Sequence, residues 1–122
     1  MQDYSIYMIS RKNRFHGYNS LRFVYRNGKS ARGSAFAVKA ALNEKRRNYR
    51  VAVIVARKVN KSAVARNRMR RRLYEVVREV EDRISGPYDI AITVFQNSLL
   101  EASHSQIKTQ LVKQLKEAGV IK

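Results

Sequence analysis

The sequence predicts a two-layer α/β sandwich with its elements in the order helix, strands, helix, strand, helix. Two short runs rich in valine and isoleucine, 50–56 and 88–95, have the length and continuous apolar character of buried strands. Between them lies a long segment whose apolar residues recur at steps of three and four, which predicts a helix. Because this helix must cross between the two strands, we expect them to be parallel, with helices chiefly on one face of the sheet.

The first half of the chain adds a short helix and a strand. Leu21, Val24 and Tyr25 have helical spacing before Asn27-Gly28, which predicts a helix over about 19–26. Residues 34–42 alternate between larger apolar residues and small ones, as in a strand with one buried face. The face expected to be buried carries Phe36, Val38, Ala40 and Leu42. The run 50–56 is expected to be a central strand.

The second half adds the long helix and a last helix. Ser62 is a suitable N-cap for a helix that runs to about residue 83, before Gly86-Pro87 breaks the pattern. Its expected buried stripe is Met69, Leu73, Val76, Val77, Val80 and Ile84. Ser103 and Gln106 resemble a capping box that opens the last helix, which Gly119 closes. We expect residues 1–10 to form an N-terminal tail and residues 11–122 to form a single domain.

Charge is the strongest compositional signal. The 122 residues include 26 Lys and Arg against 9 Asp and Glu, so the formal net charge is +17. Self-repulsion of this size strains a compact state unless a polyanion neutralises it, and clustered basic charge is typical of nucleic-acid binding. The absence of cysteine excludes disulfides and thiol nucleophiles. Neither a membrane-spanning run nor an export signal is apparent, so we expect a cytoplasmic protein without a membrane partner or an evident obligate protein partner.

The basic residues concentrate in segment 57–72, RKVNKSAVARNRMRRR, where eight of sixteen residues are Lys or Arg and none is acidic. Arginine forks suit phosphate oxygens, and a helix N-terminus offers free N–H groups to an anion. Cations at that end gain nothing from the helix dipole, so their crowding favours a phosphate partner. The candidate RNA-binding residues are Arg57, Lys58, Lys61, Arg66, Asn67, Arg68, Arg70, Arg71 and Arg72.

A catalytic centre is not apparent in the chain. His16 and His104 are too few and too isolated for a metal site or a triad, and surface positions are expected for both. The spacing of Glu75 with Arg71 and of Glu79 with Arg83 fits surface ion pairs on one helix. Neither a glycine-rich phosphate loop nor an HExxH motif occurs. We therefore assign no catalytic residue, and the sequence does not identify side chains that bind a metal.

The segment ARNRMRRRLYE, residues 65–75, resembles the signature of the protein subunit of bacterial ribonuclease P. The resemblance extends over about residues 9–120. Upstream, VAVIVARKVNKSAVARNR is similar to the family's strand, basic pair, loop and helix, and RKNRFHGYNSLRFVYRNGKS is similar to its opening segment and first helix. YDIAITVF and the terminal helix stand where the family has its last strand and helix.

This resemblance implies a fold like the second domain of a ribosomal small-subunit protein, with a left-handed crossover through the long helix. Spacing alone predicts the common right-handed one. It also implies a role in an endoribonuclease that removes the 5′ leader of precursor tRNA, with catalysis by an RNA subunit and its bound Mg²⁺. Residues 57, 58, 66–68 and 71 would contact the catalytic RNA. A cleft between the first helix and the open sheet face would hold the single-stranded leader, at the positions Leu21, Tyr25, Ala37 and Lys39.

Family members often carry an aromatic residue where Leu21 and Lys39 stand, and Lys39 is suited to bind phosphate instead. Two alternatives stay open. The first is an RNA-binding protein of ribosomal type that has no part in processing. The second is a DNA-architectural protein, which would bind duplex DNA and RNA with comparable affinity.

Overall fold

A computed structural model describes residues 11–15 and 17–122, without the side chain of Tyr18, and the predicted tail lies outside this range. The strands are β1 (Lys29–Arg32), β2 (Phe36–Leu42), β3 (Arg50–Val55) and β4 (Tyr88–Val94). The α-helices are α1 (Tyr18–Asn27), α2 (Ala63–Val80) and α3 (His104–Glu117). Three 3-10 turns, η2 (Arg11–Asn13), η3 (Glu81–Arg83) and η4 (Asn97–Leu100), complete the described elements.

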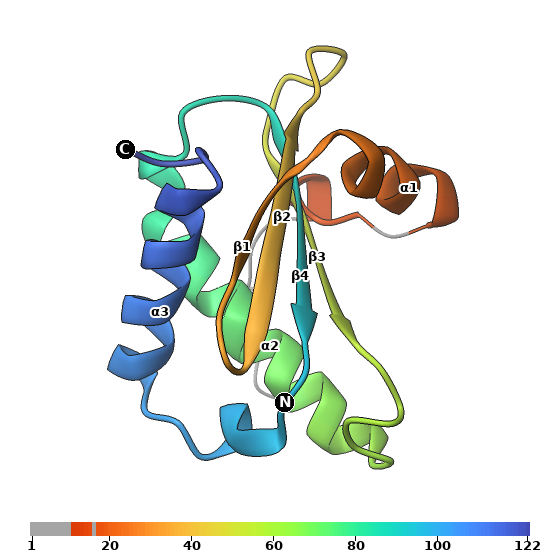
Figure 1. The fold of residues 1–122 in the computed structure, drawn as a ribbon, viewed down its shortest axis with the longest axis vertical. Coiled ribbons are helices and arrows are strands. Elements are labelled where there is room, and N and C mark those ends of the chain that lie inside the picture. The colour runs from red at the N-terminus through yellow and green to blue at the C-terminus, as the bar shows by residue number, and fades with distance from the viewer. Residues whose placement is uncertain (1–10, 16) are drawn as a thin grey trace.

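The four strands form one sheet in the order β1-β2-β4-β3. Helices α2 and α3 cover one face, and α1 lies against one end of the other face (Figure 1). The predicted parallel pairing of β3 with β4 is confirmed. The mixed α/β fold predicted from the sequence is therefore confirmed as well.

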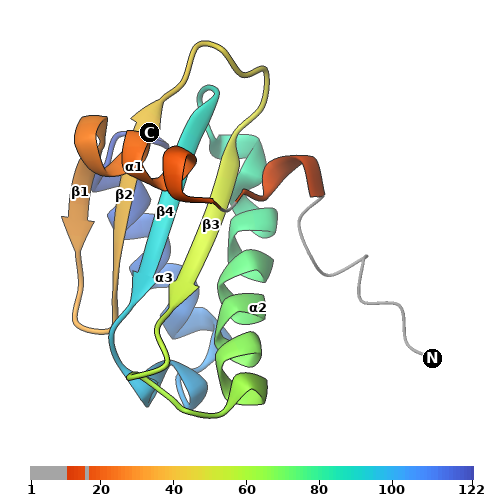
Figure 2. The ribbon, with the colours of Figure 1, turned by 90° about the vertical axis from the view of Figure 1, so that its right-hand side faces the viewer.

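The crossover through α2 is left-handed. Seen from the α1 side in Figure 2, β3 and β4 both point downward, β4 stands to the left of β3, and α2 lies behind the sheet. A right-handed crossover would place β4 on the other side of β3. The handedness implied by the family resemblance is confirmed, and the one expected from spacing alone is wrong.

Strand β3 corrects a second expectation, because it lies at an edge of the sheet rather than at its centre. The apolar character of β3 therefore does not reflect a central position in the sheet; it reflects the cover on both faces of the strand. Leu21 and Val24 of α1 pack near one face, and the side chains of α2 cover the other. The outer edge is covered too: the backbone N–H of Phe15 donates to the carbonyl of Val51 over 3.1 Å, and the N–H of Val53 lies 3.4 Å from the Tyr74 hydroxyl.

Two further differences concern the β1–β2 hairpin. Strand β1 was not expected, since its sequence, KSAR, buries only Ala31 and lacks an apolar alternation. Leu42 was expected on the buried face of β2 but is 47% exposed. It is the last residue of that strand and leads into the 43–49 loop, which projects beyond the helices (Figure 1).

The main core lies between the sheet and the α2–α3 layer, and the predicted stripe of α2 is buried there up to Val80. A smaller cluster of Phe15, Val24, Ala52 and Ala91 lies between α1 and the opposite face of the sheet. The side chain of Ser62 caps α2 as predicted, accepting from the N–H of Ala65. The predicted capping box of α3, formed by Ser103 and Gln106, is confirmed. The helical run of α2 ends at Val80 and gives way to η3.

Candidate nucleic-acid interface

The basic segment 57–72 forms the loop after β3 and the first turns of α2, which we call the α2 head. The first turn contains no acidic residue. Arg57, Lys58, Lys61, Asn67 and Arg68 are exposed, as a surface that meets phosphates requires. The α2 head therefore gathers positive charge at a helix N-terminus, where backbone N–H groups and the dipole also favour an anion.

Arg66 stabilises the loop of the α2 head. Its Nη1 donates to the carbonyl oxygens of Asn60 and Lys61, over 2.9 and 3.0 Å. The side chain of Asn60 accepts from the N–H of Ser62 and donates to Asn97 at the start of η4. The loop that presents Arg57, Lys58 and Lys61 thus has a defined shape before any partner binds.

Arg72 has its own partners within the fold. Its guanidinium donates to the carbonyl oxygens of Leu99, Leu100 and Ala102, at the end of η4 and just beyond it. A positive charge there satisfies carbonyl groups that have no helical partner. These hydrogen bonds give Arg72 a stabilising role within the fold. Its contact with RNA remains a prediction from the sequence.

A pocket of about 720 Å³ lies between the α2 head, residues 11–15 and the outer edge of β3. We call it the basic pocket. Its charged and polar lining comes from Arg11, Arg14, Asn67, Arg70 and Arg71, and it contains no acidic residue. Its apolar lining includes Phe15, Leu21, Ile54 and Tyr74. Guanidinium groups beside apolar and aromatic side chains suit a nucleotide, which has a charged phosphate and a flat base.

Two polar groups of the basic pocket are notable. Arg70 donates a hydrogen bond to the side-chain oxygen of Asn67, which fixes the orientation of that amide. The Nε of Arg14 is buried and has no hydrogen-bond partner among the described residues. A buried donor without a partner costs free energy that an incoming acceptor can recover.

Arg11 and Arg14 were not among the residues predicted from the sequence. They reach the basic pocket because residues 13–15 pair with β3. The side-chain amide of Asn13 donates to the carbonyl of Tyr49 over 2.7 Å, and Arg14 forms a parallel bridge with Val51. The only sequence signal for this placement was the Lys- and Arg-rich character of the opening segment.

The ring of Phe15 anchors the same segment. It is buried, and the guanidinium of Arg50 lies over it, 4.8 Å from the ring centroid. Arg50 itself is held by two hydrogen bonds of 2.9 Å to the carboxylate of Asp89, which is fully buried. One wall of the basic pocket thus rests on a buried ion pair.

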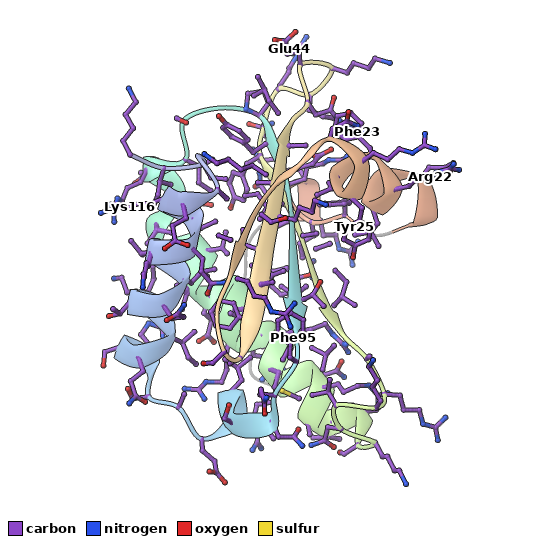
Figure 3. The ribbon with its side chains drawn as sticks, viewed as in Figure 1. Arg22, Phe23, Tyr25, Glu44, Phe95 and Lys116 are labelled. Carbon is purple, nitrogen blue, oxygen red and sulfur yellow. The ribbon has the colours of Figure 1, made fainter. Side chains whose placement is uncertain are left out.

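The predicted leader cleft lies on the α1 side of the sheet. The ammonium group of Lys39 donates to the carbonyl oxygen of Tyr25 over 2.6 Å and lies 6.0 Å from the centroid of its ring. Tyr25 is 45% exposed, on the side of α1 toward the open part of the sheet (Figure 3). Ala37 is half-buried two residues before Lys39 on the same face of β2. Of these four residues, Leu21 alone lines the basic pocket together with residues of the α2 head.

The remaining sequence expectations concern isolated polar residues. His104 is exposed as predicted, whereas His16 lies outside the described residues. Glu79 pairs with His104 and Lys108 of α3, at 2.7 and 3.2 Å, rather than with Arg83. In the described part of the chain, His, Cys, Asp and Glu side chains form no group of three that could hold a metal ion. Among the same residues, none of the helices is both long enough and apolar enough to span a bilayer.

Local contacts shift the pKa values of Tyr49 and Glu79. Burial raises the pKa of the Tyr49 hydroxyl, and its hydrogen bond of 2.6 Å to Glu81 and the charge of that carboxylate raise it further. Burial tends to raise the pKa of Glu79, but hydrogen bonds from His104 and Lys108 outweigh it and lower the value. Both groups lie away from the basic pocket.

Comparison with known proteins decides the family. The sequence profile of the family described as Ribonuclease P matches residues 9–119. The chain belongs to the ribonuclease P protein family. A ribonuclease P protein component of Bacillus cereus is 26% identical over 112 residues, which covers 92% of this chain and 96% of that protein.

Solved structures of ribonuclease P proteins share the fold. One from Staphylococcus aureus has a TM-score of 0.79 at 24% identity, over 90% of this chain and 98% of that chain. One from Thermotoga maritima has a TM-score of 0.67 at 22% identity, over 76% and 86% of the two chains. The fold implied by the ribonuclease P resemblance is therefore confirmed.

Proposed function

We propose that this chain is the protein component of a ribonuclease P ribonucleoprotein and helps its catalytic RNA to remove the 5′ leader from precursor tRNA in the cytoplasm. The observation that carries the proposal is the basic pocket. It brings Leu21, from the predicted leader cleft, and Asn67, from the predicted RNA-binding helix, to one acid-free lining with four arginines. A single-stranded leader can therefore lie next to the surface that binds the catalytic RNA.

The two surfaces have different roles in this proposal. The exposed cations of the α2 head contact phosphates of the catalytic RNA, which position the protein without reading sequence. The cleft beside α1 holds the leader through Lys39, through the exposed ring of Tyr25, and through the apolar side of the basic pocket. Stacking on an aromatic ring accepts any base, which suits leaders of varied sequence.

Mg²⁺ and the hydrolytic step belong to the RNA in this proposal. The described side chains offer no cluster that fits a metal ion, so we derive no step through a protein-bound metal. The positive charge of the protein reduces the repulsion between two polyanions, the catalytic RNA and its substrate. The protein is therefore expected to lower the Mg²⁺ concentration at which cleavage proceeds.

The test is reconstitution with a bacterial ribonuclease P RNA at low Mg²⁺. The protein is expected to restore cleavage of precursor tRNA at the mature 5′ end. Arg68→Ala is expected to weaken assembly, whereas Arg78→Ala, an exposed arginine further along α2, serves as a charge-matched control. RNA binding without any stimulation of cleavage would support the ribosomal-type alternative, and equal affinity for duplex DNA would support the DNA-architectural one.

The salt dependence of RNA affinity provides a second readout. The logarithm of the association constant is expected to fall linearly with the logarithm of salt concentration, by about 0.7–0.9 per phosphate neutralised. Arg57→Ala and Lys58→Ala should each reduce the steepness by about one phosphate contact. Variants that bind more weakly but keep the wild-type slope would show that these cations do not touch phosphate.

A further inference from the structure

A second aromatic site lies on the α1 side of the sheet, beyond the end of α1. The guanidinium of Arg32 on β1 lies over the ring of Phe95, 4.4 Å from its centroid. Phe95 directly follows β4, and its N–H donates to the carbonyl of Ala35 over 2.7 Å. In Figure 3, Phe95 lies toward the opposite end of the sheet from α1 and Tyr25.

Small residues allow this contact across the sheet. Arg32 is paired with Ala37 on β2, and Ala37 is paired in turn with Thr93 on β4. Because Ala37 carries only a methyl group on this face, the long side chain of Arg32 can pass over β2 to reach the ring. Arg32 is exposed, so its guanidinium also presents a flat surface and free donors to solvent.

A continuous strip connects this pair with the basic pocket. The register places Ile54, Thr93, Ala37 and Arg32 side by side across the four strands. Ile54 lines the basic pocket at one end, and Arg32 stacks on Phe95 at the other. Ile54, Thr93 and Ala37 are half-buried, and Arg32 is exposed. At a strand spacing of about 4.8 Å, three steps give a path of roughly 14 Å across the sheet.

We propose that Arg32 and Phe95 form a stacking site for a base of the precursor-tRNA leader, at the far end of a strip that begins at the basic pocket. The inference rests on the proposed function and extends it. The base stacks on the exposed guanidinium of Arg32, which the half-buried ring of Phe95 supports from below, and the remaining donors of Arg32 bind an adjacent phosphate. Phe95 follows Thr93 of β4 by two residues, so its ring lies on the sheet face that carries Ala37 and Lys39.

The test compares two precursor tRNAs bound to the reconstituted ribonucleoprotein. One has a leader long enough to cross the sheet, and the other has a leader trimmed to end at the basic pocket. Loss of one base stack corresponds to a decrease in affinity of at least about fivefold. Phe95→Ala is expected to cause this decrease for the long leader and to leave the affinity for the trimmed leader unchanged.

Three further variants separate stacking from charge and from packing. Phe95→Leu keeps an apolar side chain but removes the ring, and it should lose affinity as Phe95→Ala does. Arg32→Lys keeps the charge but removes the planar group, so it should lose part of the affinity. Lys113→Ala removes an exposed cation from α3, on the opposite face of the sheet, and should leave the affinity for both leaders at its wild-type value.

A fluorescent base analogue in the leader gives an independent readout. 2-Aminopurine placed at the far part of the long leader should be quenched on binding by wild type and not by Phe95→Ala. Equal losses for the two leaders, or none for either, would overturn the stacking site while leaving the proposed function intact. If wild-type protein fails to stimulate cleavage of either substrate, the proposed function itself is wrong.

Discussion

The Nη1 of Arg72 donates hydrogen bonds to the carbonyl oxygens of Leu99 and Leu100, over 2.7 and 3.1 Å, and so joins α2 to the end of η4. Hydrogen bonds to a charged group each contribute about 1.5–3 kcal/mol, and here several carbonyls share one guanidinium. We expect Arg72→Ala to lower the free energy of unfolding by about 2–3 kcal/mol in urea denaturation.

Arg68 is the matched control for that experiment, because it is an exposed arginine in the same α2 head. Arg68→Ala should change the free energy of unfolding by less than about 0.5 kcal/mol, as surface substitutions usually do. It should nevertheless weaken RNA binding. Equal stability of the two variants would contradict the structural role given to Arg72.

The buried carboxylate of Asp89 provides a second prediction. It accepts two hydrogen bonds from Arg50 and one of 2.8 Å from Asn43. Removing one partner of a buried ion pair leaves an uncompensated charge, which costs about 3–5 kcal/mol. Asp89→Asn should lower the free energy of unfolding by about that amount, measured in an osmolyte that keeps the variant folded.

Asn43→Ala removes a single hydrogen bond to the same carboxylate and should cost only about 1 kcal/mol. Because Arg50 also holds Phe15, Asp89→Asn should additionally weaken the binding of phosphate in the basic pocket. An Asp89→Asn variant no less stable than Asn43→Ala would show that the pair is not a major stabilising contact.

Phosphate is expected to stabilise the protein specifically. With a net charge of +17 and four arginines around one pocket, binding of an anion relieves repulsion in the folded state. A single site at one hundred times its dissociation constant raises the free energy of unfolding by about 2.7 kcal/mol. Thermal melts in sodium phosphate should therefore give a higher Tm than melts in sodium chloride of equal ionic strength.

Arg14→Ala should reduce this difference between phosphate and chloride, because Arg14 lines the basic pocket and its Nε is buried without a partner among the described residues. Lys113→Ala removes the same charge from α3 and should leave the difference unchanged. A Tm that rises equally in both salts would mean that general screening, not a site, accounts for the stabilisation.

The ion pairs of Glu79 predict a pH dependence. Its pKa is lowered in the folded state, since the hydrogen bonds from His104 and Lys108 outweigh the effect of burial. A carboxylate whose pKa is lower in the folded state stabilises the protein at pH values above its unfolded-state pKa of about 4.3. This stabilisation is lost as the pH falls through the folded-state pKa. Because the pair is exposed, the contribution is below about 1 kcal/mol.

The measurement compares wild type with Glu79→Gln in urea between acidic and neutral pH. Wild type should be slightly more stable at neutral pH, and the difference should vanish in acid. Thr109→Ala, an exposed substitution on α3, should show no such pH-dependent difference. A difference that persists below the folded-state pKa would exclude the carboxylate as its source.

Much of the fold followed from local patterns. Helical spacing located α1, α2 and α3, the Ser62 and Ser103 caps located two of their starts, and apolar runs located β2, β3 and β4. These features depend on residues close together in sequence, and the sequence therefore reports them directly. Strand β1 was missed because its pairing with β2 determines it more than its own composition does.

The acid-free charge of the α2 head and the family resemblance were also present in the sequence alone. Tertiary structure decided the rest of the candidate site. Pairing of residues 13–15 with the edge of β3 brought Arg11 and Arg14 to the basic pocket, and sheet register brought Arg32 to Phe95. Tertiary structure also placed Arg72 against carbonyl groups of a segment far along the chain. Such contacts join residues distant in sequence, and they form only because packing of the sheet and helices fixes their relative positions.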